Sequence, residues 1–354
     1  SKPLFRMTNP KKCDIISVRG ICVPLKVPKM QKSLAEKRWM PCAKPQPPFA
    51  HGKAPATRRA LFGAQAGHNA HTGPGCAENA PQPPRNILIL QIHGGENMDQ
   101  HTLVITGMGA VTPVGIGVNN YWQALVGGKC GVGPITRFDA SELPVQIAAE
   151  VKEFDPAAFM PKPLARTMAP FMQYAFAVGE EALAGCGLEI GREPDRVGIV
   201  MGTAMDGVTT VAETQAAYDA GHKVGPRFVP MTLGNIAAAQ IAIAHGIRGP
   251  SLTLNTACSA GGDAIMTAAM LLRSGEADAV LAVGGESILC PIVVAGLAQA
   301  KALSRRNDAP EQACRPFDMD RDGFVIGEGG GALVIETLEH ARARGAQIYA
   351  EVGS

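Results

Sequence analysis

One cysteine in this 354-residue sequence, Cys258, has the sequence context of a catalytic nucleophile. Cys258 follows an alternating apolar run at 251–255 and precedes a stretch of small residues typical of a helix. A strand, a tight turn and a helix in this order expose the side chain of the turn, and the positive end of the helix dipole favours a thiolate. This context predicts a thiol for covalent catalysis. Without it, a cysteine in an apolar chain is usually a buried structural residue, and four are assigned to that class: Cys130, Cys186, Cys290 and Cys314.

Two glycine patterns suggest nucleotide binding but have the wrong spacing. Gly107-Met108-Gly109 follows an apolar run, as in a dinucleotide-binding turn, but Thr112 occupies the position of the third glycine. The glycine run at 327–331 lacks the Lys-Ser/Thr pair of a phosphate-binding loop. Close approach of two backbone segments explains these glycines better. We therefore expect no cofactor.

Acidic residues and histidines do not indicate a metal site either. Asp318, Asp320 and Asp322 resemble the first half of an EF-hand loop, but Gly329 occupies the twelfth position, where a bidentate glutamate is needed. Three histidines lack the spacing of metal ligands and are expected at the surface or at helix ends: His222, His245 and His340. We expect no bound metal.

Strands and helices alternate around Cys258. Apolar patterns predict strands at 103–107, 196–201, 251–255, 277–284, 331–336 and 348–352. They predict helices at 121–125, 169–184, 233–244, 259–273 and 338–344, and a Gly/Pro loop at 109–117. This alternation indicates a mixed, largely parallel α/β sheet covered on both faces. No apolar run approaches the roughly 18 residues of a membrane-spanning helix, so no membrane role is expected.

Charge divides the sequence into two parts. Residues 1–97 hold 15 of the 33 Lys and Arg, four of the 31 acidic residues and 13 of the 27 prolines, which gives a net charge of +11. Residues 98–354 carry a net charge of −9. The composition of the first part resists packing, and the acidic balance of the second gives no reason to expect nucleic-acid binding.

Residues 1–97 admit three interpretations. A transit peptide should be rich in serine, but only three serines occur, and a nucleic-acid-binding arm should cluster its charges, which are scattered. We favour upstream DNA read through in frame, because an ordered apolar pattern begins only after Met98 and residues 95–97 can be encoded by a purine-rich ribosome-binding sequence. We expect a basic, Pro-rich extension without a stable fold, followed by one domain at 98–354.

Four motifs occur in order across that domain. They are VITGMGAVTP at 104–113, Thr256-Ala257-Cys258-Ser259, Gly284-Gly285-Glu286, and the stretch from Arg315-Pro316-Phe317-Asp318 through Arg321-Asp322-Gly323-Phe324 to Gly327-Glu328-Gly329. Together they resemble the beta-ketoacyl-acyl-carrier-protein synthases of the type II class, in the thiolase-like superfamily. The resemblance implies an α/β thiolase-like fold, a layered mixed sheet with helices on both faces, as the first of two pseudo-symmetric halves. It also implies a cytoplasmic location and a homodimer for the full-length protein.

The resemblance implies a decarboxylative condensation in fatty-acid chain elongation. Cys258 would take an acyl chain from acyl carrier protein as a thioester, and malonyl-carrier protein would lose CO2 and attack it. The backbone N–H of Cys258 would be one oxyanion-hole donor. Met205 and Phe228 align with positions that gate the acyl pocket in the family, although ordinary core packing explains both nearly as well.

The sequence departs from the family pattern in its second half. Relatives continue into a similar half with two catalytic histidines, and no histidine of this chain lies in a matching motif. We therefore expect a truncated gene or sequence fragment that supplies the nucleophile half. Three alternatives stay open: a polyketide condensing enzyme, a non-catalytic subunit like the chain-length factors, against which Cys258 argues, and an inactive fragment.

Overall fold

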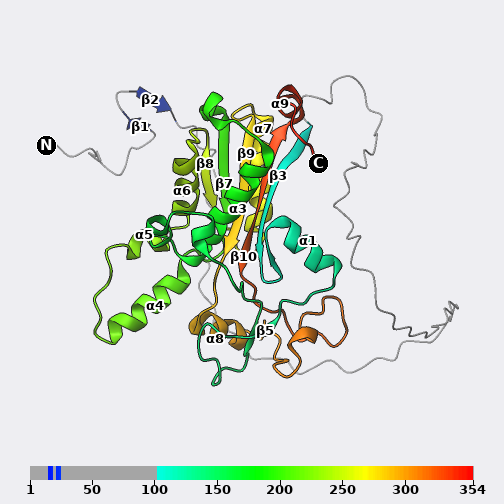
Figure 1. The fold of residues 1–354 in the computed structure, drawn as a ribbon. Helices are drawn as coiled ribbons and strands as arrows, with labels where there is room; N and C mark the ends of the chain where they lie inside the picture. Colours follow the sequence, from blue (N-terminus) through cyan, green and yellow to red (C-terminus); the bar gives the residue numbers. More distant parts are fainter. Residues whose placement is uncertain (1–14, 19–20, 25–101, 354) are drawn as a thin grey trace, which may run out of the picture. The chain divides into compact units, whose positions relative to one another are not determined.

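The computed structural model describes residues 15–18, 21–24 and 102–353 (Figure 1). The chain divides into two compact units, residues 1–77 and 78–354. In the first unit, strands β1 (Ile15–Val18) and β2 (Ile21–Pro24), which the sequence pattern does not predict, pair antiparallel. The other expectations for residues 1–97 lie outside the described residues.

A central sheet organises the second unit. Its strand order is β11-β3-β10-β9-β7-β8, with β4 paired to the end of β3. The strands are β3 (Leu103–Thr112), β4 (Gly115–Ile116), β7 (Val197–Gly202), β8 (Ser251–Leu254), β9 (Ala279–Glu286), β10 (Gly329–Thr337) and β11 (Ala350–Val352). The helices are α1 (Val118–Val126), α2 (Lys162–Ala165), α3 (Pro170–Cys186), α4 (Val208–Asp219), α5 (Phe228–Thr232), α6 (Asn235–His245), α7 (Ala260–Arg273), α8 (Pro291–Gln299) and α9 (Leu338–Ala343). All predicted strands and helices are found. The additional elements are α2, α4, α5, α8, β4 and a short antiparallel pair, β5 (Gly133–Pro134) and β6 (Ile147–Ala148).

The sheet is mixed, as predicted, but it is not largely parallel. β7 pairs parallel with β8 and with β9. β10 pairs antiparallel with β3 and β9, and β11 pairs antiparallel with β3. Helices cross over between β7, β8 and β9, which favours parallel pairing. The long connection from β9 to β10 imposes no such direction, and the prediction of a largely parallel sheet is wrong there.

Helices cover both faces of this sheet (Figure 1). Along β7, Ile199 and Met201 join the apolar cluster that contains α3 and α6, whereas Val200 joins the cluster that contains α7. Successive side chains of a strand point to opposite faces, so α3 and α7 lie on opposite sides. Helix α3 carries Pro170 in its first turn, where a missing N–H is tolerated, and 11 of its 17 residues are buried.

Strand β3 is five residues longer than the prediction of 103–107, because two of its glycines belong to a helix contact. A Cβ on Gly107 would lie 2.3 Å from the carbonyl oxygen of Ala182, and a Cβ on Gly109 would lie 2.0 Å from that of Val178. Both partners lie on α3. Glycine here permits close helix packing rather than forming the predicted loop, which shrinks to the turn between β3 and β4.

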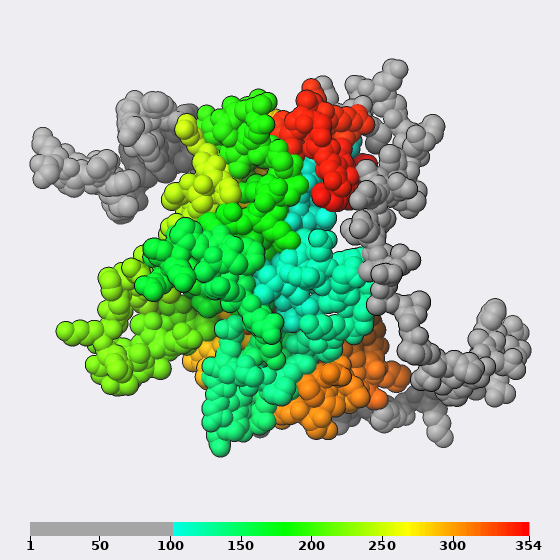
Figure 2. Space-filling view, viewed as in Figure 1, coloured from blue at the N-terminus to red at the C-terminus, as the bar shows by residue number. Residues whose placement is uncertain are grey.

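A separate apolar cluster joins two segments far apart in sequence. Val145 and Ile147 pack with Leu303 and Ile326. A backbone bridge beside them pairs Ala149 with residue 327. Figure 2 shows the blue-green surface of the first segment beside the orange surface of the second. This cluster fixes the start of the glycine run that leads into β10.

A buried ion cluster connects β10 to α9. Glu336 is fully buried and accepts hydrogen bonds from Arg344 at 2.6 and 2.8 Å, from His340 at 2.6 Å and from the Thr106 hydroxyl. Burial alone would raise the Glu336 pKa, but Arg344, His340 and Thr106 together lower it to about 2. The hydrogen bond to Glu336 raises the His340 pKa. His340 is partly buried and lies in the last turn of α9, which agrees with its predicted position at a helix end.

Candidate active site

Cys258 lies in a short 3-10 turn, η5 (Ala257–Ser259), between the end of β8 and the start of α7. The cysteine is exposed. Ala257, directly before it, has a φ of 54°, in the left-handed region that costs a non-glycine residue roughly 1–2 kcal/mol. Such a conformation persists only where surrounding contacts hold it.

Two sets of contacts hold this turn. A Cβ on Gly202, the last residue of β7, would lie 2.2 Å from the carbonyl oxygen of Ala260, so β7 packs directly against the start of α7. Asp263 Oδ2 accepts hydrogen bonds from Thr256 Oγ1 at 2.5 Å and from Ser259 Oγ at 2.8 Å. These two bonds lower the Asp263 pKa, so the carboxylate is charged at neutral pH.

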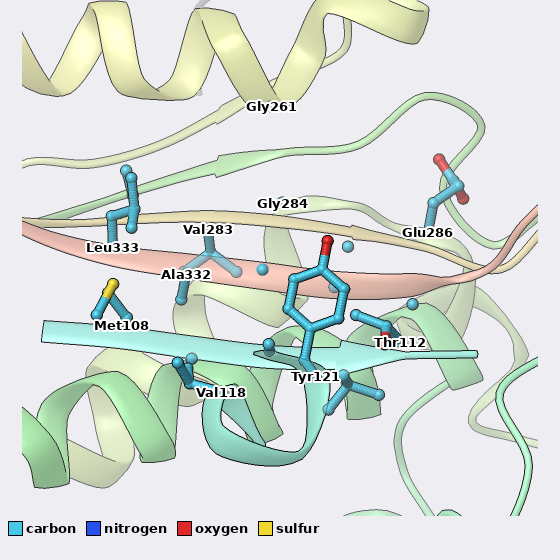
Figure 3. Close-up of a pocket in the computed structure, with 18 of the residues that line it drawn as sticks. Met108, Thr112, Val118, Tyr121, Gly261, Val283, Gly284, Glu286, Ala332 and Leu333 are labelled. Carbon is cyan, nitrogen blue, oxygen red and sulfur yellow. The ribbon is translucent and has the colours of Figure 1, made fainter. Parts of the chain in front are cut away.

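Cys258 lines a cleft of about 1320 Å³. Met108 of β3, Leu333 of β10 and Ala282 of β9 are direct cross-strand neighbours, so they form one row across the sheet at this cleft. Figure 3 shows Met108 and Leu333 there, with Tyr121 of α1 above β3. A mostly apolar cleft with one nucleophile on its wall suits an extended apolar substrate such as an acyl chain.

Glu286 organises the loop after β7, at the same cleft (Figure 3). Its Oε2 accepts hydrogen bonds from the backbone N–H groups of Ala204 at 2.6 Å and Met205 at 3.0 Å, and from the Thr203 hydroxyl at 3.2 Å. Because β9 and β7 are parallel neighbours, their carboxyl ends meet here. The sequence motif contains Glu286 but does not indicate this function.

The two predicted pocket-gating residues lie outside the cleft lining. Met205 is 43% exposed and follows Ala204, which does line the cleft. Phe228 is partly buried at the first position of α5. The structure therefore brings only Cys258 of the three predicted site residues to the cleft, and gating by the other two stays a prediction.

Glu328 is another carboxylate at the cleft, and it is buried. The sequence motif contains Glu328 but does not indicate its function. It accepts hydrogen bonds from Arg137 Nε at 2.9 Å and from Ser287 Oγ at 2.8 Å. Arg137 also donates to the Tyr174 hydroxyl at 2.8 Å. Burial, together with the nearby Glu328, raises the Tyr174 pKa, so the phenol stays protonated. No local pattern indicates an Arg137 partner 191 residues away.

The glycine run around Glu328 is explained by backbone packing, as predicted. Gly329 has a φ of 140°, and a Cβ on it would lie 2.3 Å from the carbonyl oxygen of Val111. In the preceding loop, Asp322 accepts hydrogen bonds from Ser304 Oγ at 2.7 Å and from the Arg305 backbone at 3.0 Å. The EF-hand-like acidic residue thus stabilises a loop.

Two of the four cysteines assigned to the structural class are buried and two are not. Burial raises the pKa of the Cys186 and Cys290 thiols. Cys130 and Cys314 are exposed in loops, so the assignment to a buried class is wrong for them. Composition does not distinguish a loop cysteine from a core cysteine.

The other two histidines among the described residues make a structural contact or are exposed. His245 ends α6 and lies 2.6 Å from Glu180, and His222 is exposed after α4, as predicted. Within residues 15–18, 21–24 and 102–353, no cluster of three or more His, Cys, Asp or Glu is arranged to hold a metal ion. None of the helices in those ranges is long and apolar enough to cross a membrane.

Comparison with known proteins gives the family. Residues 100–341 match the family model described as beta-ketoacyl synthase, N-terminal domain. A 3-oxoacyl-[acyl-carrier-protein] synthase 2 of Vibrio cholerae is 44% identical over 259 residues, covering 72% of this chain and 62% of the relative. The protein of the same name from Coxiella burnetii is 42% identical over 261 residues, with the same coverage. The chain therefore spans less than two thirds of the length of these relatives.

Solved structures agree with the predicted fold. A beta-ketoacyl synthase from Burkholderia phymatum matches with a TM-score of 0.64 at 31% identity, covering 71% of this chain and 62% of that one. A ketosynthase complex with a type II polyketide acyl-carrier protein matches with a TM-score of 0.61 at 29% identity, covering 71% and 61%. The layered α/β sheet is the thiolase-like fold, and the chain belongs to the beta-ketoacyl synthase family.

Proposed function

We propose that residues 98–354 supply the nucleophile of a 3-oxoacyl-[acyl-carrier-protein] synthase that elongates fatty acids. The observation that carries this proposal is the Cys258 thiol, exposed in a strained strand-to-helix turn on the wall of an apolar cleft. The names of the relatives, 3-oxoacyl-[acyl-carrier-protein] synthase 2, support the reaction class.

The chemistry proceeds in two steps. The Cys258 sulfur attacks the acyl thioester of acyl carrier protein, and the carrier thiol leaves with a proton. Malonyl-carrier protein then releases CO2, and the electron pair of the broken bond forms a C–C bond to the acyl carbon. The Cys258 thiolate leaves, which restores the enzyme and gives a ketoacyl product two carbons longer. The Cys258 N–H stabilises the oxyanion in each step.

The substrate partners are acyl- and malonyl-carrier proteins. Support comes from the names of the relatives and from the solved complex of a ketosynthase with a carrier protein. That complex belongs to a type II polyketide synthase, so a polyketide condensing enzyme is the second candidate. Comparing the products formed from fatty acyl and polyketide carrier substrates separates the two.

We also propose that the enzyme is a homodimer that pairs through β8. This strand is at one end of the sheet, and Ser251 and Leu252 on it are exposed. Ile243 on the neighbouring α6 is 74% exposed. An apolar edge of this kind favours pairing with a second copy. Light scattering should give the mass of a dimer, and Leu252→Asp should shift it toward the monomer. The cytoplasmic location stays a prediction from the family resemblance.

We also propose that the exposed face of α7 packs against a second half of the protein. Met266 and Met270 on α7 are 56% and 63% exposed, although α7 follows the nucleophile turn directly. Exposed methionines on this helix support packing of its outer face against a second, similar half that carries the two catalytic histidines. On this proposal, residues 98–354 alone should release CO2 from malonyl-carrier protein far more slowly than a complete homologue.

Acyl transfer tests the proposed nucleophile directly. The chain is incubated with dodecanoyl-carrier protein, and the adduct is located by peptide mass spectrometry. We expect a dodecanoyl thioester on Cys258, lost in Cys258→Ala and retained in Cys314→Ala. Cys258→Ala should keep the circular-dichroism spectrum, because the side chain is exposed. A thioester on Cys314 or Cys130, or no adduct, contradicts the proposal.

A further inference from the structure

The nucleophile turn contains an acidic residue to which the proposed mechanism gives no function. We propose that Asp263 is a positioning residue: its carboxylate holds the turn so that the Cys258 sulfur faces the cleft. This inference rests on the proposed function, in which Cys258 is the nucleophile. It concerns a residue on the first turn of α7, five positions after the cysteine.

The geometry carries the inference. A single oxygen, Asp263 Oδ2, accepts hydrogen bonds from Thr256 and Ser259, which stand on the two sides of the Ala257–Cys258 pair. The Ser259 hydroxyl also lies 2.9 Å from the Thr256 carbonyl oxygen. These contacts enclose Ala257, whose φ of 54° would otherwise relax to the negative values that alanine prefers. Relaxation rotates the peptide that joins Ala257 to Cys258 and moves the sulfur.

Ordinary helix capping does not account for Asp263. An acidic side chain in the first turn of a helix usually accepts from backbone N–H groups or balances the dipole. Here Oδ2 is occupied by the two hydroxyls, and the N-cap residue Ser259 makes no side-chain capping bond. The position of Asp263 is therefore explained by the Thr256 and Ser259 hydroxyls that its carboxylate holds.

Two substitutions separate geometry from charge. Asp263→Ala removes both the acceptor and the charge, whereas Asp263→Asn keeps an acceptor oxygen and removes only the charge. The readout is the second-order rate of iodoacetamide labelling at Cys258 in the full chain, followed by peptide mass spectrometry and divided by the rate at Cys314. We expect Asp263→Ala to lower this ratio by about five- to tenfold, and Asp263→Asn to keep it within about twofold or raise it.

A second background tests the link to Ala257. Glycine adopts positive φ without strain, so Ala257→Gly should make the turn less dependent on the carboxylate. We expect Asp263→Ala to change the labelling ratio by less than about twofold in the Ala257→Gly background. This loss of additivity is the signature of a shared conformational restraint. A helix that was merely weaker at its N-terminus would show the same Asp263→Ala effect in both backgrounds.

The control is Asp155→Ala, which removes a comparable acceptor from the turn at 156–158, where Asp155 accepts from the Ala157 N–H at 2.9 Å. It should leave the labelling ratio unchanged. If Asp263→Ala does not fold, as judged by circular dichroism, Thr256→Val and Ser259→Ala each remove one of the two bonds and should give smaller decreases. Unmodified protein in which Cys258 reacts no faster than Cys314 contradicts the proposed nucleophile. Fast Cys258 labelling that Asp263→Ala leaves unchanged, or raises as Asp263→Asn does, overturns the positioning role alone.

Discussion

The two faces of the central sheet are closed to different degrees. On the α3 face, Phe171 and Met172 are 1% and 0% exposed, and glycines of β3 bring the helix backbone close to the sheet. On the α7 face, Met266 and Met270 are more than half exposed, and Gly261 and Ile265 of the same helix line the cleft that contains Cys258. The α3 face is therefore closed by tight packing, whereas the helix on the other face follows the proposed nucleophile.

The Glu336 cluster and the Asp263 contacts also differ in burial and in the segments that they join. The Glu336 cluster is buried, connects three elements and contains no group at the cleft. The Asp263 contacts lie in an exposed turn and join residues within one short segment. The buried ion cluster lies on an interior strand of the sheet and restrains the fold, whereas the function proposed for the exposed Asp263 carboxylate is to restrain one side chain.

The largest expected effect is on the closed face. Phe171→Ala should lower the free energy of unfolding by about 3–5 kcal/mol, because it removes a buried ring and leaves a cavity. Met270→Ala, on the open face, should change it by less than about 1 kcal/mol. Urea denaturation measures both. Equal losses would show that the two faces are equally packed.

The next effect is on the buried ion cluster. Glu336→Gln leaves Arg344 and His340 without their charged partner and should cost about 3–5 kcal/mol. The matched control is Glu189→Gln, which breaks the exposed pair with Arg192 and should cost less than about 1 kcal/mol. Similar denaturation midpoints for the two variants would contradict the expectation that the buried ion cluster stabilises the fold more than the exposed ion pair does.

The same cluster should make stability depend on pH. The Glu336 pKa falls from 4.5 to about 2 on folding, so its contribution is present above about pH 4.5 and is lost as the pH falls toward 2, by an amount on the order of 3 kcal/mol. The His340 pKa is raised from 6.5 by Glu336 and also by Asp278, against the effect of Arg344. Its contribution is present below pH 6.5 and is lost at higher pH. Urea midpoints from pH 2 to 9 should show both losses in the unmodified protein and smaller losses in Glu336→Gln, where Asp278 still raises the His340 pKa.

Much of the fold follows from local sequence patterns. Each predicted strand and helix is found in the structure, because the periodicity that predicts it lies within its own segment. The turn at Cys258 is predicted by the strand before it and the small residues after it. The direction of β10 is not predicted, since pairing depends on a long connection. The length of β3 is not predicted either, because its glycines serve a contact with α3.

The candidate site also contains residues that local sequence identifies and residues whose functions depend on distant contacts. Cys258 can be identified from its own segment, whereas Glu286 and Glu328 acquire their functions from partners 82 and 191 residues away. Asp263 is different, because Thr256 is only seven residues before it. Two hydroxyl residues on either side of a turn and a following Asp are a local signal that sequence reasoning could have used.

The most direct test of the central claim compares five thiols in one reaction. Iodoacetamide labelling of the native chain should proceed fastest at Cys258, more slowly at the exposed Cys130 and Cys314, and most slowly at the buried Cys186 and Cys290. Exposure alone would give Cys258 the same rate as Cys130 and Cys314. We therefore expect a Cys258 rate at least about tenfold above both. Equal rates at Cys258, Cys130 and Cys314 would contradict the claim that this turn activates its thiol.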